Sequence, residues 1–194
     1  MDAHPKTDEE LMHEYAQGDA QALSLLFSKY KEPVFNFCLR ILRNRSEAED
    51  VTSETFMALL NKKYVRQSSA KFSTWLYTIA RNTSISRIRK KQKLFSLWTK
   101  NKEGQDTLMD VVDTTPLIRD EMESRQKNNM LEDSLKRLPT DLKEALVLRE
   151  FHDLSYEDIA QVLGCSLAKV KILIFRAREV LRQKFLASLK EETL

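Results

Sequence analysis

Glycine is nearly absent from this chain, which has three glycines and four prolines among its 194 residues. Tight turns between β-strands rely on glycine, and the sequence contains no Asn-Gly or Asp-Gly pair that could close a hairpin. Apolar residues make up 42% of the chain, which is enough for hydrophobic cores. The sequence therefore predicts an all-α protein.

Charged side chains are sorted into blocks along the chain. Residues 71–102 contain nine basic side chains and no acidic one, and residues 165–190 contain seven basic and one acidic. Between these blocks, residues 103–126 contain seven acidic and two basic side chains. Basic blocks of this kind predict surfaces that bind a polyanion, and the acidic blocks predict contacts with a different partner.

Residues 96–126 lack the apolar periodicity of a helix and contain Gly104 and Pro116. A connection of this length within a compact protein is either functional or disordered. We therefore expect a flexible acidic linker between two small helical domains, residues 1–95 and 127–194.

The first domain is predicted from apolar residues at helical spacing. Those between 23 and 30 share one helical face, and Pro33 predicts that a new helix begins there. Ser46 and Glu49 have the spacing of a capping box, which predicts the start of the next helix. One flank of that helix would be acidic, with Glu47, Asp50 and Glu54.

Aromatic and basic side chains lie close together in residues 72–93. Trp75 and Tyr77 precede Arg81 and Asn82. Further cations follow at Arg87, Arg89, Lys90 and Lys91. This pattern suits single-stranded DNA, because unpaired bases stack on rings while cations meet the backbone. Trp75 also fits the inner face of the helix, where it would pack in the core instead.

A second basic region follows a short and specific pattern. Ser155 and Asp158 have capping-box spacing, Gly164 can end that helix in a left-handed conformation, and Ser166 can cap the next helix. The pattern predicts a helix, a three-residue turn and a second helix. This arrangement places the second helix in a DNA major groove.

Four cations follow on the second helix of this motif, at Lys169, Lys171, Arg176 and Arg178. They can bind phosphates, and a lysine or arginine can also read a guanine edge. The alternative is an ordinary surface helix with a solvated basic face.

No apolar run approaches the 18 residues of a membrane span, and the polar, acidic N-terminus is unlike a signal peptide. Cys38 and Cys165 both lie within apolar patterns, which is typical of reduced, buried thiols. We therefore expect a cytoplasmic protein. The three histidines have no metal-ligand spacing with either cysteine, and no phosphate-binding glycine loop occurs, so we expect no metal, no cofactor and no catalytic residues.

Three segments together resemble the extracytoplasmic-function (ECF) group of bacterial RNA polymerase sigma factors. They are AEDVTSETFMALL (48–60), FSTWLYTIARNTSISRIRK (72–90) and the stretch from LKRLPTDLKEALVLRE to FRAR (135–178). The resemblance implies a region 2 helical bundle and a region 4 helix-turn-helix domain. It also implies a non-enzymatic factor that binds core polymerase, recognises −10 and −35 promoter elements and helps to melt the −10 DNA.

The resemblance also implies roles for individual residues. Core polymerase, through its β′ clamp helices, would be bound by Asp50, Val51, Glu54 and Phe56. The −10 element would be contacted by Tyr64, Ser68, Ser69, Lys71, Phe72, Trp75, Tyr77, Arg81 and Asn82, with the loop 62–71 capturing a flipped base. The −35 element would be contacted by Arg149, Ser166, Lys169, Lys171, Ile172, Phe175, Arg176 and Arg178. The partners implied are core RNA polymerase (β′ clamp helices and β flap), promoter DNA and an anti-sigma factor, which in this family is often membrane-anchored, with no small-molecule substrate.

The chain departs from the family pattern on its second basic helix. Where the family often has TVKSRL, this chain has KVKILI, so Ile172 and Leu173 replace a Ser-Arg pair. We expect fewer hydrogen bonds to the −35 element and more apolar contact, for example with thymine methyl groups. Alternatively, Ile172 packs against a partner protein.

Two other classes of protein compete with this interpretation. An ordinary helix-turn-helix regulator, in which residues 1–95 sense a ligand or dimerise, explains the C-terminal half but not the aromatic and basic helix. The second class is a nucleic-acid enzyme, but this sequence contains no candidate metal ligands and no phosphate-binding glycine loop.

Overall fold

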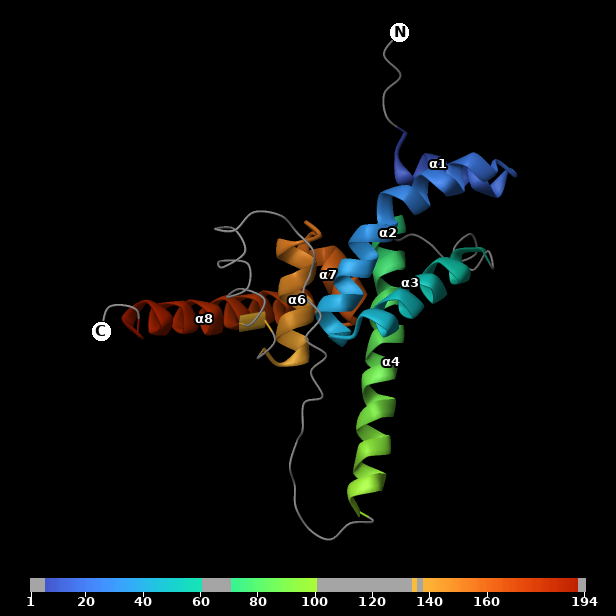
Figure 1. The fold of residues 1–194 in the computed structure, drawn as a ribbon. Helices are drawn as coiled ribbons and strands as arrows, with labels where there is room; N and C mark the ends of the chain where they lie inside the picture. Colours follow the sequence, from blue (N-terminus) through green and yellow to red (C-terminus); the bar gives the residue numbers. More distant parts are fainter. Residues whose placement is uncertain (1–5, 61–70, 101–133, 136–137, 192–194) are drawn as a thin grey trace. The chain divides into compact units, whose positions relative to one another are not determined.

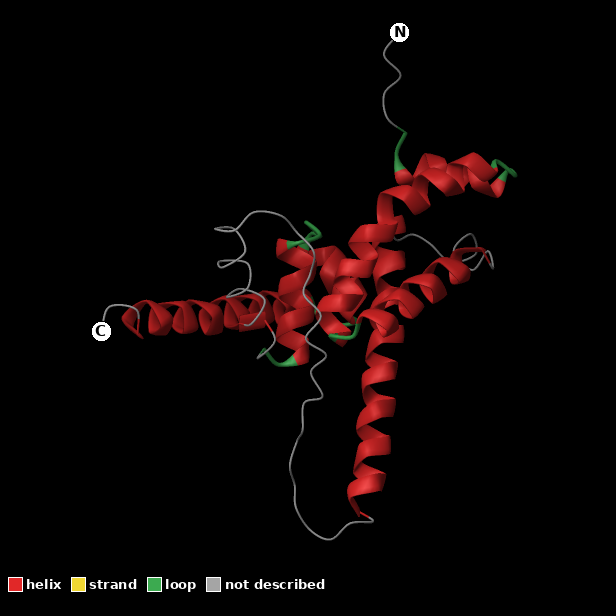
Figure 2. Cartoon of the chain, viewed as in Figure 1, coloured by secondary structure: helices red, strands yellow, loops and turns green. Residues whose placement is uncertain are grey.

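The structure is a computed structural model that describes residues 6–60, 71–100, 134–135 and 138–191. All regular structure in these residues is helical, with no strand among them, which confirms the predicted all-α class (Figure 2). No helix in this part of the chain is long and apolar enough to cross a membrane.

Contacts divide the chain into two units, residues 1–114 and 115–194. The first unit contains α1 (Asp8–Ala16), α2 (Ala20–Leu42), α3 (Arg45–Leu60) and α4 (Phe72–Lys100) (Figure 1). The second unit contains α6 (Thr140–Glu150), α7 (Tyr156–Leu163) and α8 (Leu167–Glu191).

The linker prediction was wrong at its first residues, because α4 continues through residues 96–100. No glycine or proline occurs between Phe72 and Gly104, so nothing in the backbone chemistry ends the helix earlier. The rest of the predicted linker lies outside the described residues.

Helix α1 was not anticipated from the sequence, because its start is marked only by polar residues. Thr7 Oγ1 accepts a hydrogen bond from the Glu10 backbone N–H, and the Glu10 carboxylate accepts one from the Thr7 N–H at 2.7 Å. This reciprocal capping box satisfies two backbone donors at the start of the helix. Glu9 of α1 accepts a hydrogen bond from the backbone N–H of Phe72, so α1 also holds the first turn of α4.

Helix α2 runs without interruption through Pro33, so the prediction of a new helix there was wrong. Proline removes one backbone hydrogen bond and disfavours a helix interior. Tertiary packing compensates here, because Leu26 before the proline and Val34 and Phe37 after it are all fully buried. Both halves of α2 therefore contribute to the same core.

The start of α3 was also mispredicted. The helix begins at Arg45, and Asn44 caps it by accepting a hydrogen bond from the Glu47 backbone N–H at 2.9 Å. Ser46 lies within the first turn and cannot act as the N-cap.

Aromatic rings from α2 and α4 form much of the core of the first unit. Tyr30 packs edge-on against Phe72, and Phe37 packs edge-on against Tyr77, with ring centroids 5.3 Å and 5.6 Å apart. Tyr77 is only 2% exposed, and burial raises the pKa of its phenol.

Small polar groups meet at the centre of this core. Thr52 of α3 and Ser84 of α4 are buried, and each hydroxyl donates to the backbone carbonyl four residues earlier. The thiol of Cys38 in α2 is buried beside these two hydroxyls, and burial raises its pKa to about 11. Cys38 is therefore the buried thiol that the sequence predicted, whereas Cys165 is only partly buried.

The predicted helix-turn-helix is confirmed in the second unit. Ser155 Oγ accepts a hydrogen bond from the Asp158 N–H and donates one to the Asp158 carboxylate. Gly164 ends α7 at φ 63°, the left-handed conformation that glycine adopts without steric cost. Ser166 then accepts from the Lys169 N–H at 3.3 Å and caps α8. Buried Ile159, Val170 and Ile174 join α7 and α8 in one core.

Candidate functional site

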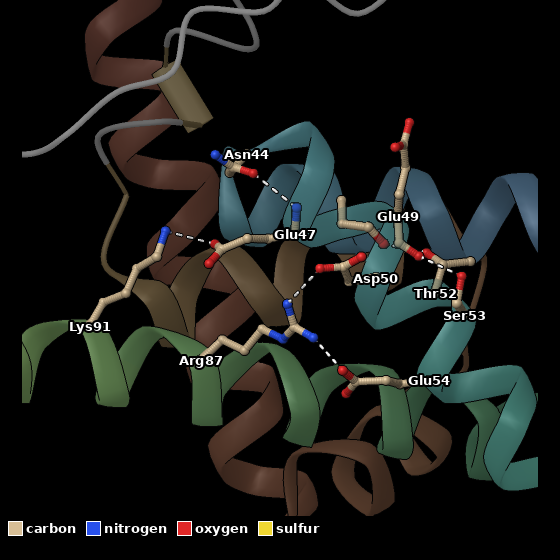
Figure 3. A network of polar contacts seen from close by, with 10 residues as sticks. Asn44, Glu47, Glu49, Asp50, Thr52, Ser53, Glu54, Arg87 and Lys91 are labelled. Carbon is tan, nitrogen blue, oxygen red and sulfur yellow. Dashed lines mark hydrogen bonds and ion pairs between the residues drawn. The ribbon is translucent and has the colours of Figure 1, made fainter.

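The acidic flank predicted on α3 is present, and cations from α4 bind it (Figure 3). Arg87 of α4 lies between Asp50 and Glu54, with Nη1 3.3 Å from Asp50 Oδ2 and Nη2 in contact with Glu54 Oε1. One turn further along α4, Lys91 Nζ lies 2.8 Å from Glu47 Oε2. We call these five residues the α3–α4 seam.

The guanidinium of Arg87 is the centre of the seam. Partial burial alone would lower the pKa of Arg87, but hydrogen bonds to Glu54 and Asp50 raise it above its usual value. From the sequence, Arg87 and Lys91 were expected among the cations that face DNA. The structure instead pairs both with the carboxylates of α3, a contact across more than 30 residues that helical periodicity cannot reveal.

The four residues predicted to bind polymerase divide into two pairs. The carboxylate side chains of Asp50 and Glu54 are 61% and 50% exposed. Val51 is fully buried and Phe56 is 6% exposed, so the structure corrects their assignment as surface contacts. Val51 packs in the core, and Phe56 packs edge-on against Phe27 of α2.

The residues predicted to contact the −10 element also separate by burial. Lys71 and Asn82 are exposed, while Trp75 and Arg81 are partly buried. Phe72 and Tyr77 are core residues with no ring face open to a base, and the structure corrects both assignments. Tyr64, Ser68 and Ser69 lie outside the described residues.

Among the cations predicted to contact the −35 element, two arginines are paired within their own domain. Arg178 donates to Glu150 at 2.6 Å, and Arg149 donates to the Leu154 carbonyl and lies over the Tyr156 ring. These contacts bind both arginines to their own domain, although the resemblance implied that both contact the −35 element. The other residues predicted to contact the −35 element are all exposed: Ser166, Lys169, Lys171, Ile172, Phe175 and Arg176.

Leu173 differs from its neighbour Ile172 in position. Leu173 is 6% exposed and packs in the domain core, whereas Ile172 is 51% exposed. Of the Ile172-Leu173 pair that replaces Ser-Arg in the family pattern, only Ile172 therefore changes the exposed surface.

Sequence reasoning missed an apolar groove between α2 and α3. It has a volume of about 440 Å³ and is lined mainly by Leu23, Phe27, Phe56, Met57 and Leu60. Phe27 and Phe56 pack edge-on with centroids 4.7 Å apart at its floor, and Met57 and Leu60 are more than half exposed. The sequence did contain a sign of this groove, because α3 has more apolar residues than one core-facing stripe requires.

No group of three or more histidine, cysteine or acidic side chains in the described part of the chain is arranged to hold a metal ion. The features that stand out are an acidic flank on α3, basic faces on α4 and α8, and a helix-turn-helix. Together they define a helical DNA-binding protein with two separate units.

The family follows from comparison with known proteins. Residues 26–94 match the family described as Sigma-70 region 2, and residues 128–181 match Sigma-70, region 4. The chain is 34% identical over 191 residues to the RNA polymerase sigma-H factor of Pseudomonas aeruginosa, covering 95% of this chain and 96% of that protein. It is 33% identical to the ECF RNA polymerase sigma factor SigW of Bacillus subtilis, covering 87% and 91%.

Two solved structures have a similar fold. CnrH in complex with the cytosolic domain of CnrY has a TM-score of 0.67 at 20% identity, covering 94% of this chain and 99% of that chain. The sigma factor RpoE in complex with the anti-sigma factor NepR from Bartonella quintana has a TM-score of 0.64 at 22% identity, covering 84% and 95%.

The chain belongs to the sigma-70 family and is an ECF RNA polymerase sigma factor that directs transcription initiation. This confirms the resemblance found in the sequence. Sigma factors are not enzymes, so the enzyme alternative is set aside together with the ordinary helix-turn-helix regulator.

Proposed function

We propose that this chain binds core RNA polymerase through the acidic flank of α3 and grips a promoter through α4 at the −10 element and α8 at the −35 element. The observation that carries the proposal is the separation of charge by surface. Exposed carboxylates lie on α3, while α4 and α8 each present exposed cations. The acidic surface suits a protein partner, and the basic surfaces suit a polyanion such as DNA.

The polymerase contact is assigned to Asp50 and Glu54. Their side chains are at least half exposed, and Arg87 holds both in fixed positions, so little conformational freedom would be lost on binding. Val51, which is fully buried, would support α3 from the core. The β′ clamp helices would bind this flank, and the β flap would bind the second unit.

The −10 contact is assigned to the exposed face at the start of α4. Lys71, Trp75, Arg81 and Asn82 would meet the melted strand, and Arg81 Nη1 already donates to Asn82 Oδ1 at 3.3 Å. The loop 62–71, with Tyr64, Ser68 and Ser69, would capture a flipped base. Unstacking one base costs a few kcal/mol, which contacts with the extruded base can offset.

The −35 contact is assigned to the exposed face of α8. Lys169, Lys171 and Arg176 would bind phosphates or base edges in the major groove. Arg149 and Arg178 would act indirectly, by fixing α6 and the turn before α7 against the recognition helix.

The chain would act in the cytoplasm under the control of an anti-sigma factor. The relatives RpoE and CnrH have been solved in complex with NepR and with the cytosolic domain of CnrY. An inhibitor of this kind, often membrane-anchored in the family, would cover the polymerase-binding surfaces of the two units.

Run-off transcription with core polymerase and a promoter library tests this proposal. We expect promoter-specific initiation that requires the chain. Asn82→Ala should weaken open-complex formation and leave core binding unchanged, while Ser86→Ala, an exposed polar control on the same helix, should change neither. Loss of core binding together with open-complex formation would mean that the −10 surface is misplaced. A chain that binds duplex DNA alone and never joins core polymerase would contradict the whole proposal.

A further inference from the structure

Two large apolar side chains project from the basic face of α8. Ile172 is 51% exposed and Phe175 is 70% exposed, the highest exposed fraction among the large apolar side chains of the described residues. The two are three residues apart, so they lie on the same side of the helix. We call this pair the apolar ridge.

The exposed side chains beside the ridge are mainly basic or small, and the one acidic neighbour, Glu179, lies one turn beyond Phe175 and is ion-paired with Arg182. Lys169, Lys171 and Arg176 are exposed, and the described residues include no hydrogen bond or ion pair made by these three side chains. The neighbouring cations Arg178 and Arg182, in contrast, are both paired with glutamates. A surface that covers the ridge must therefore be anionic around its edge and apolar at its centre.

The major groove of DNA offers that combination. Phosphates line its edges, and the apolar group that its base pairs present is the 5-methyl group of thymine. A protein partner is less suitable, because it would have to supply several carboxylates around one apolar contact.

The spacing of the ridge also fits base pairs. Three residues of an α-helix advance about 4.5 Å along its axis. One base-pair step advances about 3.4 Å. Ile172 and Phe175 would therefore reach neighbouring base pairs.

We propose that the apolar ridge selects the −35 element by contact with thymine methyl groups on neighbouring base pairs. This inference rests on the proposed docking of α8 at the −35 element. At the two base pairs that the ridge contacts, discrimination between bases would depend on the presence of a thymine methyl group. Leu173 is buried and Ile172 offers no hydrogen bond to a base edge.

Removal of single methyl groups from the DNA tests this inference. Holoenzyme assembled from the full chain and core polymerase is first used to select −35 sequences from a randomised promoter library. Each thymine of the selected element is then replaced by dU, which lacks only the 5-methyl group, and the affinity of the holoenzyme is measured. We expect about a fourfold loss of affinity at each of two neighbouring base pairs, the effect of exposing one buried methyl group.

Protein variants assign each methyl group to a side chain. With Ile172→Ala, the effect of dU should disappear at one base pair, and with Phe175→Ala it should disappear at the other. Leu25→Ala provides a matched control, because Leu25 of α2 is also an apolar side chain with 56% exposure. It should retain both effects.

Several results would overturn the inference and leave the proposed function intact. These are a selected −35 element without thymine at neighbouring positions, an equal loss with dU in Ile172→Ala and in the wild-type chain, and weaker binding of Ile172→Ala to core polymerase in the absence of DNA. The last result would identify the ridge as a protein contact. Initiation that does not depend on the −35 sequence at all would instead overturn the docking of α8.

Discussion

Arg87→Ala should destabilise the first unit by about 1 kcal/mol. Exposed ion pairs contribute about 0.2–1 kcal/mol each. Arg87 makes two of them and is itself 26% exposed, so the upper part of this range applies to the sum. Loss of the packed aliphatic part of the arginine adds to the cost. For a domain of this size, about 1 kcal/mol corresponds to a fall of about 4–8 °C in Tm.

Tryptophan fluorescence can follow this unit in the intact chain, because both tryptophans, Trp75 and Trp98, lie in it. Arg89→Ala is the matched control, since Arg89 is exposed on the same helix and has no ion pair among the described residues. A double-mutant cycle of Arg87→Ala with Glu54→Ala should give a coupling of about 0.5 kcal/mol. This coupling should decrease in about 1 M salt, where the screening length is about 3 Å.

The reasoning would be refuted by additivity within error in that cycle, or by equal destabilisation from Arg87→Ala and Arg89→Ala. Either result would mean that the seam seen in the structure contributes no energy. A coupling that does not respond to salt would indicate that the aliphatic part of Arg87, and not its charge, stabilises the contact.

Further substitutions test the turn, a helix cap and the core. Gly164→Ala should cost about 1 kcal/mol in thermal unfolding followed by circular dichroism, because alanine is strained at φ 63°; no atom lies within 4 Å of the added Cβ, so a much larger loss would contradict this account. Asn44→Ala should cost about 1 kcal/mol while Ser46→Ala is nearly neutral, and the reverse order in urea unfolding would restore the original capping assignment. At pH 8, mass spectrometry should show alkylation of Cys165 well before Cys38, whose pKa burial raises to about 11. That pKa also implies that the contribution of the thiol to stability is constant below the ordinary thiol pKa and falls as pH rises from there through about 11. Cys38→Ala should remove this contribution and leave the fall at higher pH that the raised pKa of the buried Tyr77 phenol produces.

The helix-turn-helix could be predicted in detail because its signals are local. Ser155, Asp158, Gly164 and Ser166 lie within 12 residues of one another, and each acts on the backbone next to it. No tertiary contact competes with these signals, so capping and turn chemistry alone locate both helices.

Elsewhere, tertiary packing overrode the local signals. Pro33 was expected to separate two helices, but burial on both sides of it keeps α2 continuous. Tyr77 was expected to face DNA, but α4 packs against α2 on that side and its ring meets Phe37. A single sequence specifies which residues share a helical face but not how many neighbouring helices cover that face.

The sequence predicted which segments are charged, but not which charged side chains pair with each other. The acidic flank of α3 and the basic block of α4 were each evident from composition, yet the ion pair between Arg87 and Glu54 joins residues 33 positions apart. The same limit applies to Arg178 and Glu150, which are 28 positions apart. Pairing of this kind depends on how helices cross, which periodicity does not encode.

The meeting of Cys38, Thr52 and Ser84 has a consequence for how tightly the geometry of the first unit is defined. Small side chains from three different helices meet here, and a shift of one helix along another would replace them with larger apolar groups and leave the thiol without a polar neighbour. This trio therefore acts as a registration point for α2, α3 and α4. If α3 binds the polymerase and α4 the melted strand, as proposed, the fixed alignment would set the spacing between the two contacts, even where its contribution to stability is small.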